Sequence, residues 1–140
     1  MFEILQKYQH RGSFKFRRFD DLKEVCNAPT DKSGVYMVWT EIGAKRYLLC
    51  IGRSGKMVND VIEHRKAGLG GKKDRLMNGH QFGKIARKRS WPMIMEKQGI
   101  AELDVYWYDT GHDDPVVVEH ALLAEFQDNY GQLPPWNSIA

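Results

Sequence analysis

The chain has 140 residues, of which 42% are hydrophobic and 28% are charged, the composition of an ordinary globular domain. No apolar run approaches the ~20 residues of a membrane-spanning helix, and the first residues lack the apolar core of a secretion signal. The two cysteines, Cys26 and Cys50, have no metal-binding spacing, which argues against a disulfide or a zinc site. We therefore expect one domain over residues 1–140, located in the cytoplasm and without a membrane partner.

The first half of the chain predicts a β-hairpin preceded by smaller elements. Two runs rich in β-branched and aromatic residues, at 35–40 and 46–51, are typical of strands. Gly43 lies between them and is the expected pivot of their connection. Before the hairpin we expect a short strand at 13–18, a short helix at 20–25 and a turn at 28–34.

The second half of the chain predicts mainly helices. Val58, Val61 and Ile62 have helical spacing, which predicts a helix at 57–68 that ends at Gly68. The other expected elements are a basic loop at 68–74, a helix in the second half of 75–90, a strand at 101–110, a helix from the N-cap Asp114 and Pro115 to about residue 129, and an irregular segment at 131–137 containing Pro134 and Pro135. The predicted fold class is α+β: an α/β sandwich in which helices flank a small, mostly antiparallel, three-stranded sheet.

A carboxylate lies where the last helix should be apolar. Leu122, Leu123 and Phe126 form its expected buried stripe, and Glu119 precedes them by three, four and seven residues, which places it on the same face. A buried carboxylate is costly unless it is paired, hydrogen-bonded or bound to a metal. Glu119 is therefore either half of a structural salt bridge with a basic residue of the middle segment or a functional acid in a cleft. Glu125 is expected on the solvent side.

Positive charge is concentrated in one segment. Seven lysines and arginines against Asp74 alone give Lys72 to Arg89 a net charge of +6, which leaves −3 for the rest of the chain. Such asymmetry indicates a polyanionic partner, and the alternative is a solvated helix face. If the partner is a nucleic acid, the residues expected to contact its phosphates are Lys72, Lys73, Lys84, Arg87, Lys88 and Arg89.

These motifs occur in an order that resembles a known family. Gly34-Val35-Tyr36 is followed after thirteen residues by Cys50-Ile51-Gly52, then by the basic segment, Glu119 and the ending Pro-Pro-Trp-Asn. This set, spanning residues 33–137, resembles the GIY-YIG nuclease superfamily, and the Gly-rich loop and the ending are similar to its restriction-enzyme-like branch. Cys50 stands where the family usually has tyrosine. Tyr47 lies three positions away and would point to the opposite face unless a bulge intervenes.

The resemblance implies an endonuclease that hydrolyses DNA phosphodiester bonds with Mg²⁺ or Mn²⁺. By its pattern, Tyr36 positions or activates water, Arg75 (or Arg65) stabilises the phosphate, and Glu119 binds the metal. His80 (or His64) matches the family's histidine, and Asn137 matches its terminal asparagine, which we expect to brace the site. A homodimer would allow both strands of a duplex to be cut.

Two other functions are compatible with the same residues. The first is a nucleic-acid-binding module on a degenerate nuclease scaffold, with Cys50 marking the lost chemistry. The second is a protein-interaction domain whose basic segment meets an acidic partner. RNA also stays open as a substrate, because no residue pattern distinguishes it from DNA.

Overall fold

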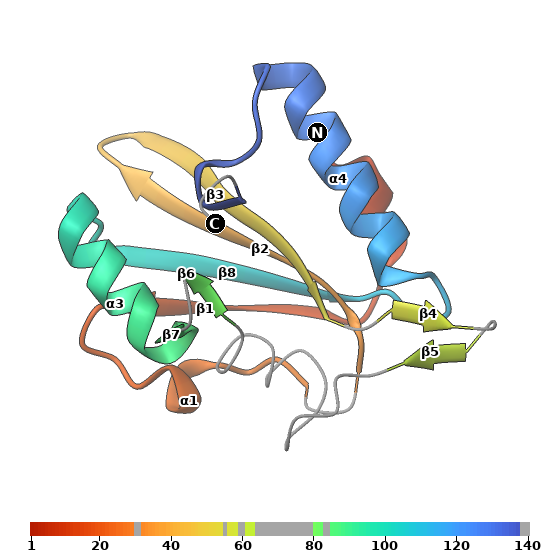
Figure 1. Cartoon of the computed structure of the whole chain (residues 1–140), viewed down its shortest axis with the longest axis horizontal. Helices are drawn as coiled ribbons and strands as arrows, with labels where there is room; N and C mark the ends of the chain where they lie inside the picture. The colour runs from red at the N-terminus through yellow and green to blue at the C-terminus, as the bar shows by residue number, and fades with distance from the viewer. Residues whose placement is uncertain (30–31, 55, 59–60, 64–79, 83–84, 138–140) are drawn as a thin grey trace.

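The computed structural model describes residues 1–29, 32–54, 56–58, 61–63, 80–82 and 85–137, with the backbone alone at 56–58, 61–63, 80–82 and 85–89. Its centre is one antiparallel sheet with helices on both faces (Figure 1), which confirms the predicted α+β class. The sheet has four strands in the order β1 (Arg11–Arg17), β8 (Glu102–Asp109), β2 (Gly34–Ile42) and β3 (Lys45–Ser54).

The prediction of three strands was therefore wrong. The leading strand, β1, is paired with β8 along all seven of its residues, from Arg11 opposite Tyr108 to Arg17 opposite Glu102. Its alternation explains this position, because Phe14 and Phe16 are buried while their neighbours face solvent. β1 is thus an edge strand of the main sheet.

The predicted hairpin is confirmed and is longer than expected. β2 and β3 pair from Gly34 opposite Ser54 to Ile42 opposite Lys45. Gly43 lies in their connection with a φ of 65°, in the left-handed region that glycine adopts at low cost. Because β2 pairs with β8 on its other side, β3 forms the second edge of the sheet.

Each face of the sheet carries its own hydrophobic cluster. Tyr36 and Val38 of β2 belong to the cluster shared with α1 (Leu22–Val25) and α3 (Arg87–Gln98). Val35 and Met37, one residue out of phase, belong to the cluster shared with α4 (Pro115–Tyr130) and the 3₁₀ helix η1 (Glu3–Lys7). Alternate residues of β2 thus point to opposite layers, and α3 and α4 are well separated in Figure 1.

The helix predicted at 57–68 was wrong wherever the structure describes it, whereas the helix predicted in the second half of 75–90 was wrong at 85–86 and confirmed at 87–90, which open α3. β4 (Lys56–Val58) pairs with β5 (Val61–Glu63), and β6 (His80–Phe82) pairs with β7 (Ile85–Ala86). Val58 and Val61 are opposite each other in the register of the small hairpin, and β-branched residues such as valine favour extended backbone over helix. Residues 64–79, with the predicted loop at 68–74, lie outside the described residues.

The last helix forms as its end signals predict. The Asp114 side chain accepts a hydrogen bond from the Val116 amide, Pro115 opens the helix, and Gly131 ends it with a φ of 75°. Leu122 and Phe126 are buried as expected. The irregular segment differs from the prediction in one respect, because residues 135–137 form a short 3₁₀ helix, η2 (Pro135–Asn137).

No helix in the described part of the chain is both long and apolar enough to cross a membrane.

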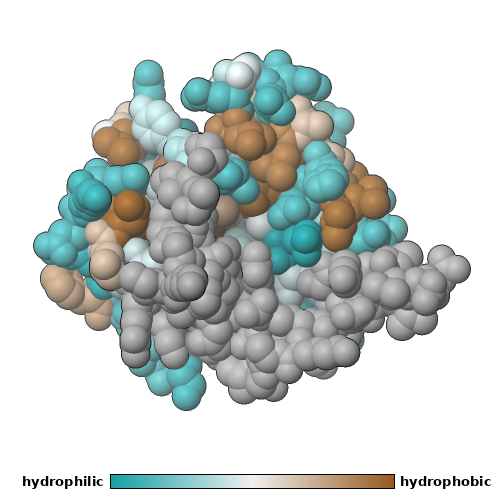
Figure 2. All heavy atoms as spheres, in the orientation of Figure 1, coloured by the Kyte–Doolittle hydropathy of each residue, from teal (hydrophilic) through white to brown (hydrophobic). Residues whose placement is uncertain are grey.

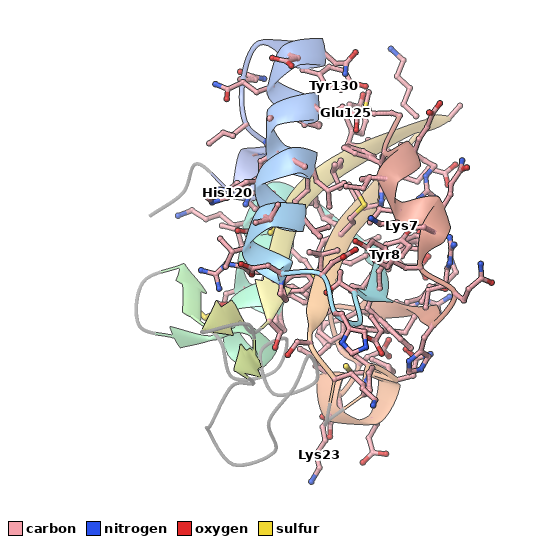
Figure 3. All side chains as sticks on the ribbon, turned by 90° about the vertical axis from the view of Figure 1, so that its right-hand side faces the viewer. Lys7, Tyr8, Lys23, His120, Glu125 and Tyr130 are labelled. Atoms are coloured by element: carbon pink, nitrogen blue, oxygen red, sulfur yellow. The ribbon has the colours of Figure 1, made fainter. Side chains whose placement is uncertain are left out.

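The N-terminal segment is fastened to α4 and to the loop before it. The Phe2 amide donates a 2.9 Å hydrogen bond to Oε2 of Glu125, so this residue, expected on the solvent side, is half-buried and contacts the N-terminal segment. In Figure 3, Glu125 lies on the side of α4 that faces this segment. The Tyr8 hydroxyl donates a 2.7 Å hydrogen bond to Oδ2 of Asp113, and Nζ of Lys7 is 3.1 Å from the same oxygen.

Removing the Tyr8 hydroxyl is expected to lower stability in a pH-dependent way. The hydrogen bond from Tyr8, and to a lesser extent the one from Lys7, holds the pKa of Asp113 below its usual value. The ionised Asp113 therefore stabilises the fold fully above its unfolded pKa of ~3.9, and this stabilisation is lost as the pH falls through the lower pKa of the folded state. Tyr8→Phe should lower the free energy of unfolding by about 1 kcal/mol at pH 7. Urea titrations at pH 7 and at about pH 3 measure the difference, which should shrink at the lower pH. A difference of equal size at both values would contradict this account.

Candidate active site at the edge strand β3

Three consecutive residues of β3 each contact one residue that the sequence singled out. Ile51 bonds to Asn137, Gly52 lies under Tyr36, and Arg53 pairs with Glu119. These contacts bring together a strand, the last helix and the C-terminal 3₁₀ helix at the edge of the sheet. This stretch, Ile51–Arg53, is called the edge site below.

Gly52 provides the surface on which Tyr36 lies. The two residues are directly opposite in the β2–β3 ladder, and a Cβ added to Gly52 would overlap the Tyr36 ring and hydroxyl. Tyr36 is 0% exposed, so the ring fills the space that a side chain at residue 52 would occupy. The glycine of the second motif is therefore explained by the tyrosine of the first.

Gly34 permits a close approach of a different kind. A Cβ at this residue would overlap the backbone carbonyl oxygen of Tyr108 in β8. Because that oxygen belongs to the β2–β8 ladder, it has little freedom to move aside. Both glycines of the motifs thus let neighbouring parts of the sheet pack closely.

Asn137 binds the backbone of β3 through both ends of its side-chain amide. The Ile51 amide donates to Oδ1 of Asn137 at 2.8 Å, and Nδ2 of Asn137 donates to the Ile51 carbonyl at 2.7 Å. The preceding Trp136 is 1% exposed, donates from Nε1 to Oε1 of Gln98 at 3.1 Å, and has its ring centre 6.2 Å from that of Trp91. The tryptophan anchors the segment, and the asparagine holds the backbone of Ile51.

Loss of the Asn137 amide is expected to destabilise this edge. In Asn137→Ala, the buried backbone groups of Ile51 lose two hydrogen bonds, which should cost about 1–3 kcal/mol of unfolding free energy. The matched control is Asn129→Ala, since the exposed Asn129 side chain donates its hydrogen bond to the Glu125 carbonyl within its own helix. Urea denaturation of both variants measures the contrast. Equal stabilities for the two would mean that the Asn137 bonds contribute nothing beyond those to water.

Glu119 lies on α4 facing the other side of the edge site. Its Oε1 is 3.3 Å from Nε of Arg53, and the side chains are 16% and 39% exposed respectively. The predicted basic partner therefore exists, but it comes from the hairpin and not from the middle segment. The sequence offered a signal for Arg53, which directly follows Gly52, yet the prediction concentrated on arginines farther along the chain.

Tyr36 and Glu119 approach β3 from opposite faces. Tyr36 and Gly52 belong to the face covered by α3, whereas Arg53 is opposite Val35, which belongs to the face covered by α4. Side chains directly across an antiparallel ladder share a face. A substrate that met both Tyr36 and Glu119 would therefore have to reach around the free edge of β3.

Cys50 and Tyr47 occupy different surroundings. Cys50 is buried opposite Val38, on the face of Tyr36. The register shifts by one residue at a bulge between Val38 and Trp39, so that Tyr47 is opposite Thr40. This pairing places Tyr47 on the same face of the sheet as Cys50 and Tyr36. Tyr47 is 45% exposed, and its partner Thr40 is four residues from Tyr36, roughly 13 Å along the strand. Tyr47 does not replace the missing motif tyrosine at the edge site.

The remaining predicted residues belong to the middle segment. His80 is in β6, and Arg87, Lys88 and Arg89 form the first turn of α3; only their backbone is described. Lying outside the described residues are His64, Arg65, Lys72, Lys73, Arg75 and Lys84. The structure thus brings together Tyr36, Glu119, Asn137 and the two motifs around the edge site, and it leaves the arginine and histidine predictions untested.

The donors at the edge site fit a metal with few protein ligands. Among the described residues, no group of three or more His, Cys, Asp or Glu side chains is placed to hold an ion. Glu119 supplies one partly buried carboxylate, a hard oxygen ligand of the kind Mg²⁺ prefers while it keeps several waters. A single-carboxylate site for Mg²⁺ or Mn²⁺ is therefore chemically consistent with these side chains.

Two cavities formed by described residues lie away from the edge site. One, of about 300 Å³, is lined mainly by aromatic and apolar residues that include Phe2, Trp39 and Phe126. The other, of about 410 Å³, lies by Arg18, Phe19 and Ile100. Neither is lined by Tyr36, Glu119 or Asn137.

On the face seen in Figure 2, hydrophobic side chains gather along α4 in the upper part of the molecule.

A comparison of the chain with family models, with curated proteins and with solved structures finds no match.

Proposed function

We propose that this protein is a metal-dependent endonuclease of the GIY-YIG type that hydrolyses DNA phosphodiester bonds. The observation that carries the proposal is the edge site, where Tyr36, Glu119 and Asn137 contact three consecutive residues of one strand. These residues come from segments far apart in the sequence. Their convergence on Ile51–Arg53, at and directly after the second motif, supports a shared site, which an accidental motif match does not predict.

Each residue has a role suited to its chemistry. Glu119 would hold Mg²⁺ or Mn²⁺, which when bound would polarise the phosphate and stabilise the leaving oxygen. Tyr36, fixed against Gly52, would orient the attacking water. Arg75 would hold the phosphate and offset its growing charge, with His80 assisting. Asn137 would keep the strand in place without touching the reacting atoms.

The start of α3 supports a polyanionic substrate. Its first turn contains Arg87, Lys88 and Arg89 and no acidic residue. Cations at a helix N-terminus oppose the helix dipole and so do not help the helix itself. Their presence is better explained by attraction to phosphates, which gives affinity without sequence specificity. Cutting of both DNA strands would then call for a homodimer.

One observation favours a second candidate, the nucleic-acid-binding module without catalysis. Tyr36 is 0% exposed and Cys50 is also buried, so neither side chain of the Tyr36 face meets solvent at the edge site in this structure. A binding module would retain salt-dependent affinity for DNA and show no metal-dependent cutting.

Digestion of plasmid and linear DNA by the purified protein tests the proposal. We expect cutting with Mg²⁺ or Mn²⁺ and none with chelator, and discrete fragments would add sequence specificity. Binding to DNA without cutting under all metal conditions would establish the binding module instead. Absence of both binding and cutting would refute both candidates and favour a protein-interaction domain. Parallel reactions on RNA of the same sequence distinguish the two nucleic acids.

A further inference from the structure

We propose that Arg53 is a second phosphate-binding arginine of the edge site, held by Glu119 until a divalent metal takes that carboxylate. This inference rests on the proposed function. It assigns a role to a residue that lies outside the family motifs and was not among the predicted site residues. It also predicts that Arg53 exchanges Glu119 for a phosphate when metal is bound, and a DNA-binding measurement can test this exchange without any cleavage.

The position of Arg53 suits it to both partners. It directly follows Gly52 on the edge strand, and its Nε lies 3.3 Å from Oε1 of Glu119. Its side chain is 39% exposed, whereas that of Glu119 is 16% exposed. The guanidinium is thus partly in solvent, while the carboxylate is largely enclosed. A ligand approaching the edge of β3 would meet the guanidinium.

The energetics allow the exchange. An ion pair with one partner this exposed contributes little, because solvent screens it. A divalent cation attracts the same carboxylate with twice the charge. A phosphate in turn offers the guanidinium two oxygens in the bidentate geometry that arginine matches. Metal and phosphate together would therefore replace one weak pair by two stronger ones.

Arg46 provides a matched control on the same strand. Its Nη1 lies 3.6 Å from Oδ2 of Asp104, and its side chain is 44% exposed. It is seven residues from Arg53, roughly 20 Å along the strand, and its guanidinium lies over the Trp39 ring, 5.1 Å from the ring centre. Arg46→Gln removes the same charge from a similar pair remote from the edge site.

The test measures binding of a short labelled DNA duplex by fluorescence anisotropy in EDTA and in Ca²⁺, which takes the same kind of oxygen ligands as Mg²⁺. The ionic strength is matched between the two conditions, and each measurement is repeated over a series of salt concentrations. In Ca²⁺, Arg53→Gln should weaken binding about tenfold, the loss of one charge-assisted contact, and reduce the salt slope by about one. In EDTA its effect should be within about twofold. Arg46→Gln should behave as wild type in both. Arg53→Lys, which keeps the charge, should lie between wild type and Arg53→Gln in Ca²⁺.

The outcomes separate this inference from the proposed function. If the wild type binds DNA and the Arg53→Gln effect is the same in EDTA and Ca²⁺, no exchange occurs and the inference fails while DNA binding stands. If Arg53→Gln has no effect in either, Arg53 is only a structural partner of Glu119. If the wild type binds no DNA in either condition, the proposed function fails and the inference with it. Circular dichroism of each variant confirms that the fold is intact.

Discussion

Glu119→Gln is expected to reduce metal-dependent cleavage at least about 100-fold, the scale of losing an essential electrostatic group. Glutamine keeps the volume and one oxygen of glutamate but not the charge that a divalent cation needs. The fold should survive, because the Arg53 pair is partly exposed and exposed pairs contribute about 0–1 kcal/mol. Cleavage rate and thermal unfolding are measured on the same preparation.

The control for this variant lies on the same helix. Glu125→Gln makes the same chemical change six residues away, at a carboxylate that accepts a hydrogen bond from Phe2 and is remote from Arg53. We expect it to cut at a rate close to that of the wild type. If Glu119→Gln cuts as fast as Glu125→Gln, the metal is not held by Glu119 and the assignment of the edge site is wrong.

Gly34→Ala is expected to be the more destabilising of the two motif glycine substitutions, with a loss of about 3 kcal/mol of unfolding free energy. The added methyl group would overlap the carbonyl oxygen of Tyr108, which is part of the central ladder. β2 and β8 would have to separate at this point, and hydrogen bonds of both strands would weaken. The shift of the urea midpoint measures the loss.

Gly52→Ala serves as the comparison. Its methyl group would overlap the side chain of Tyr36, not a backbone atom, so part of the strain can be relieved and the cost should be smaller, about 1–2 kcal/mol. In a double-mutant cycle with Tyr36→Ala, the penalty of Gly52→Ala should fall because the ring is gone. A Gly34→Ala protein as stable as the wild type would show that the two strands do not approach as closely as the structure has them.

The elements with strong local signals were predictable. Asp114 and Pro115 mark the start of α4 through backbone requirements that depend on few neighbours. The helix prediction for 57–68 failed because the spacing of Val58, Val61 and Ile62 is compatible with both a helix and a tight hairpin. Tertiary context decides between the two. The fourth strand was underestimated because a short run such as residues 13–18 does not reveal its partner.

Most residues that meet at the edge site were singled out from the sequence, but Arg53 and the arrangement of the residues were not. Glu119 stood out as an acid on an apolar helix face, and Asn137 by its place in the family pattern. That Glu119 pairs with Arg53, and that it reaches β3 from the face opposite Tyr36, depends on the ladder register and on which layer α4 covers. Register and layer are long-range properties, which the local pattern of residues leaves open.

The amide clamp of Asn137 also governs how this sheet can meet another chain. An edge strand exposes backbone donors and acceptors on which a foreign strand can grow. At Ile51 both groups are already bonded by Asn137, so no added strand can pair with that residue. Two copies that associate to cut a duplex would therefore not join their sheets through this part of β3. The Asn137 side chain thus takes the place that a neighbouring strand would have at Ile51, and it protects the second motif against edge-to-edge aggregation.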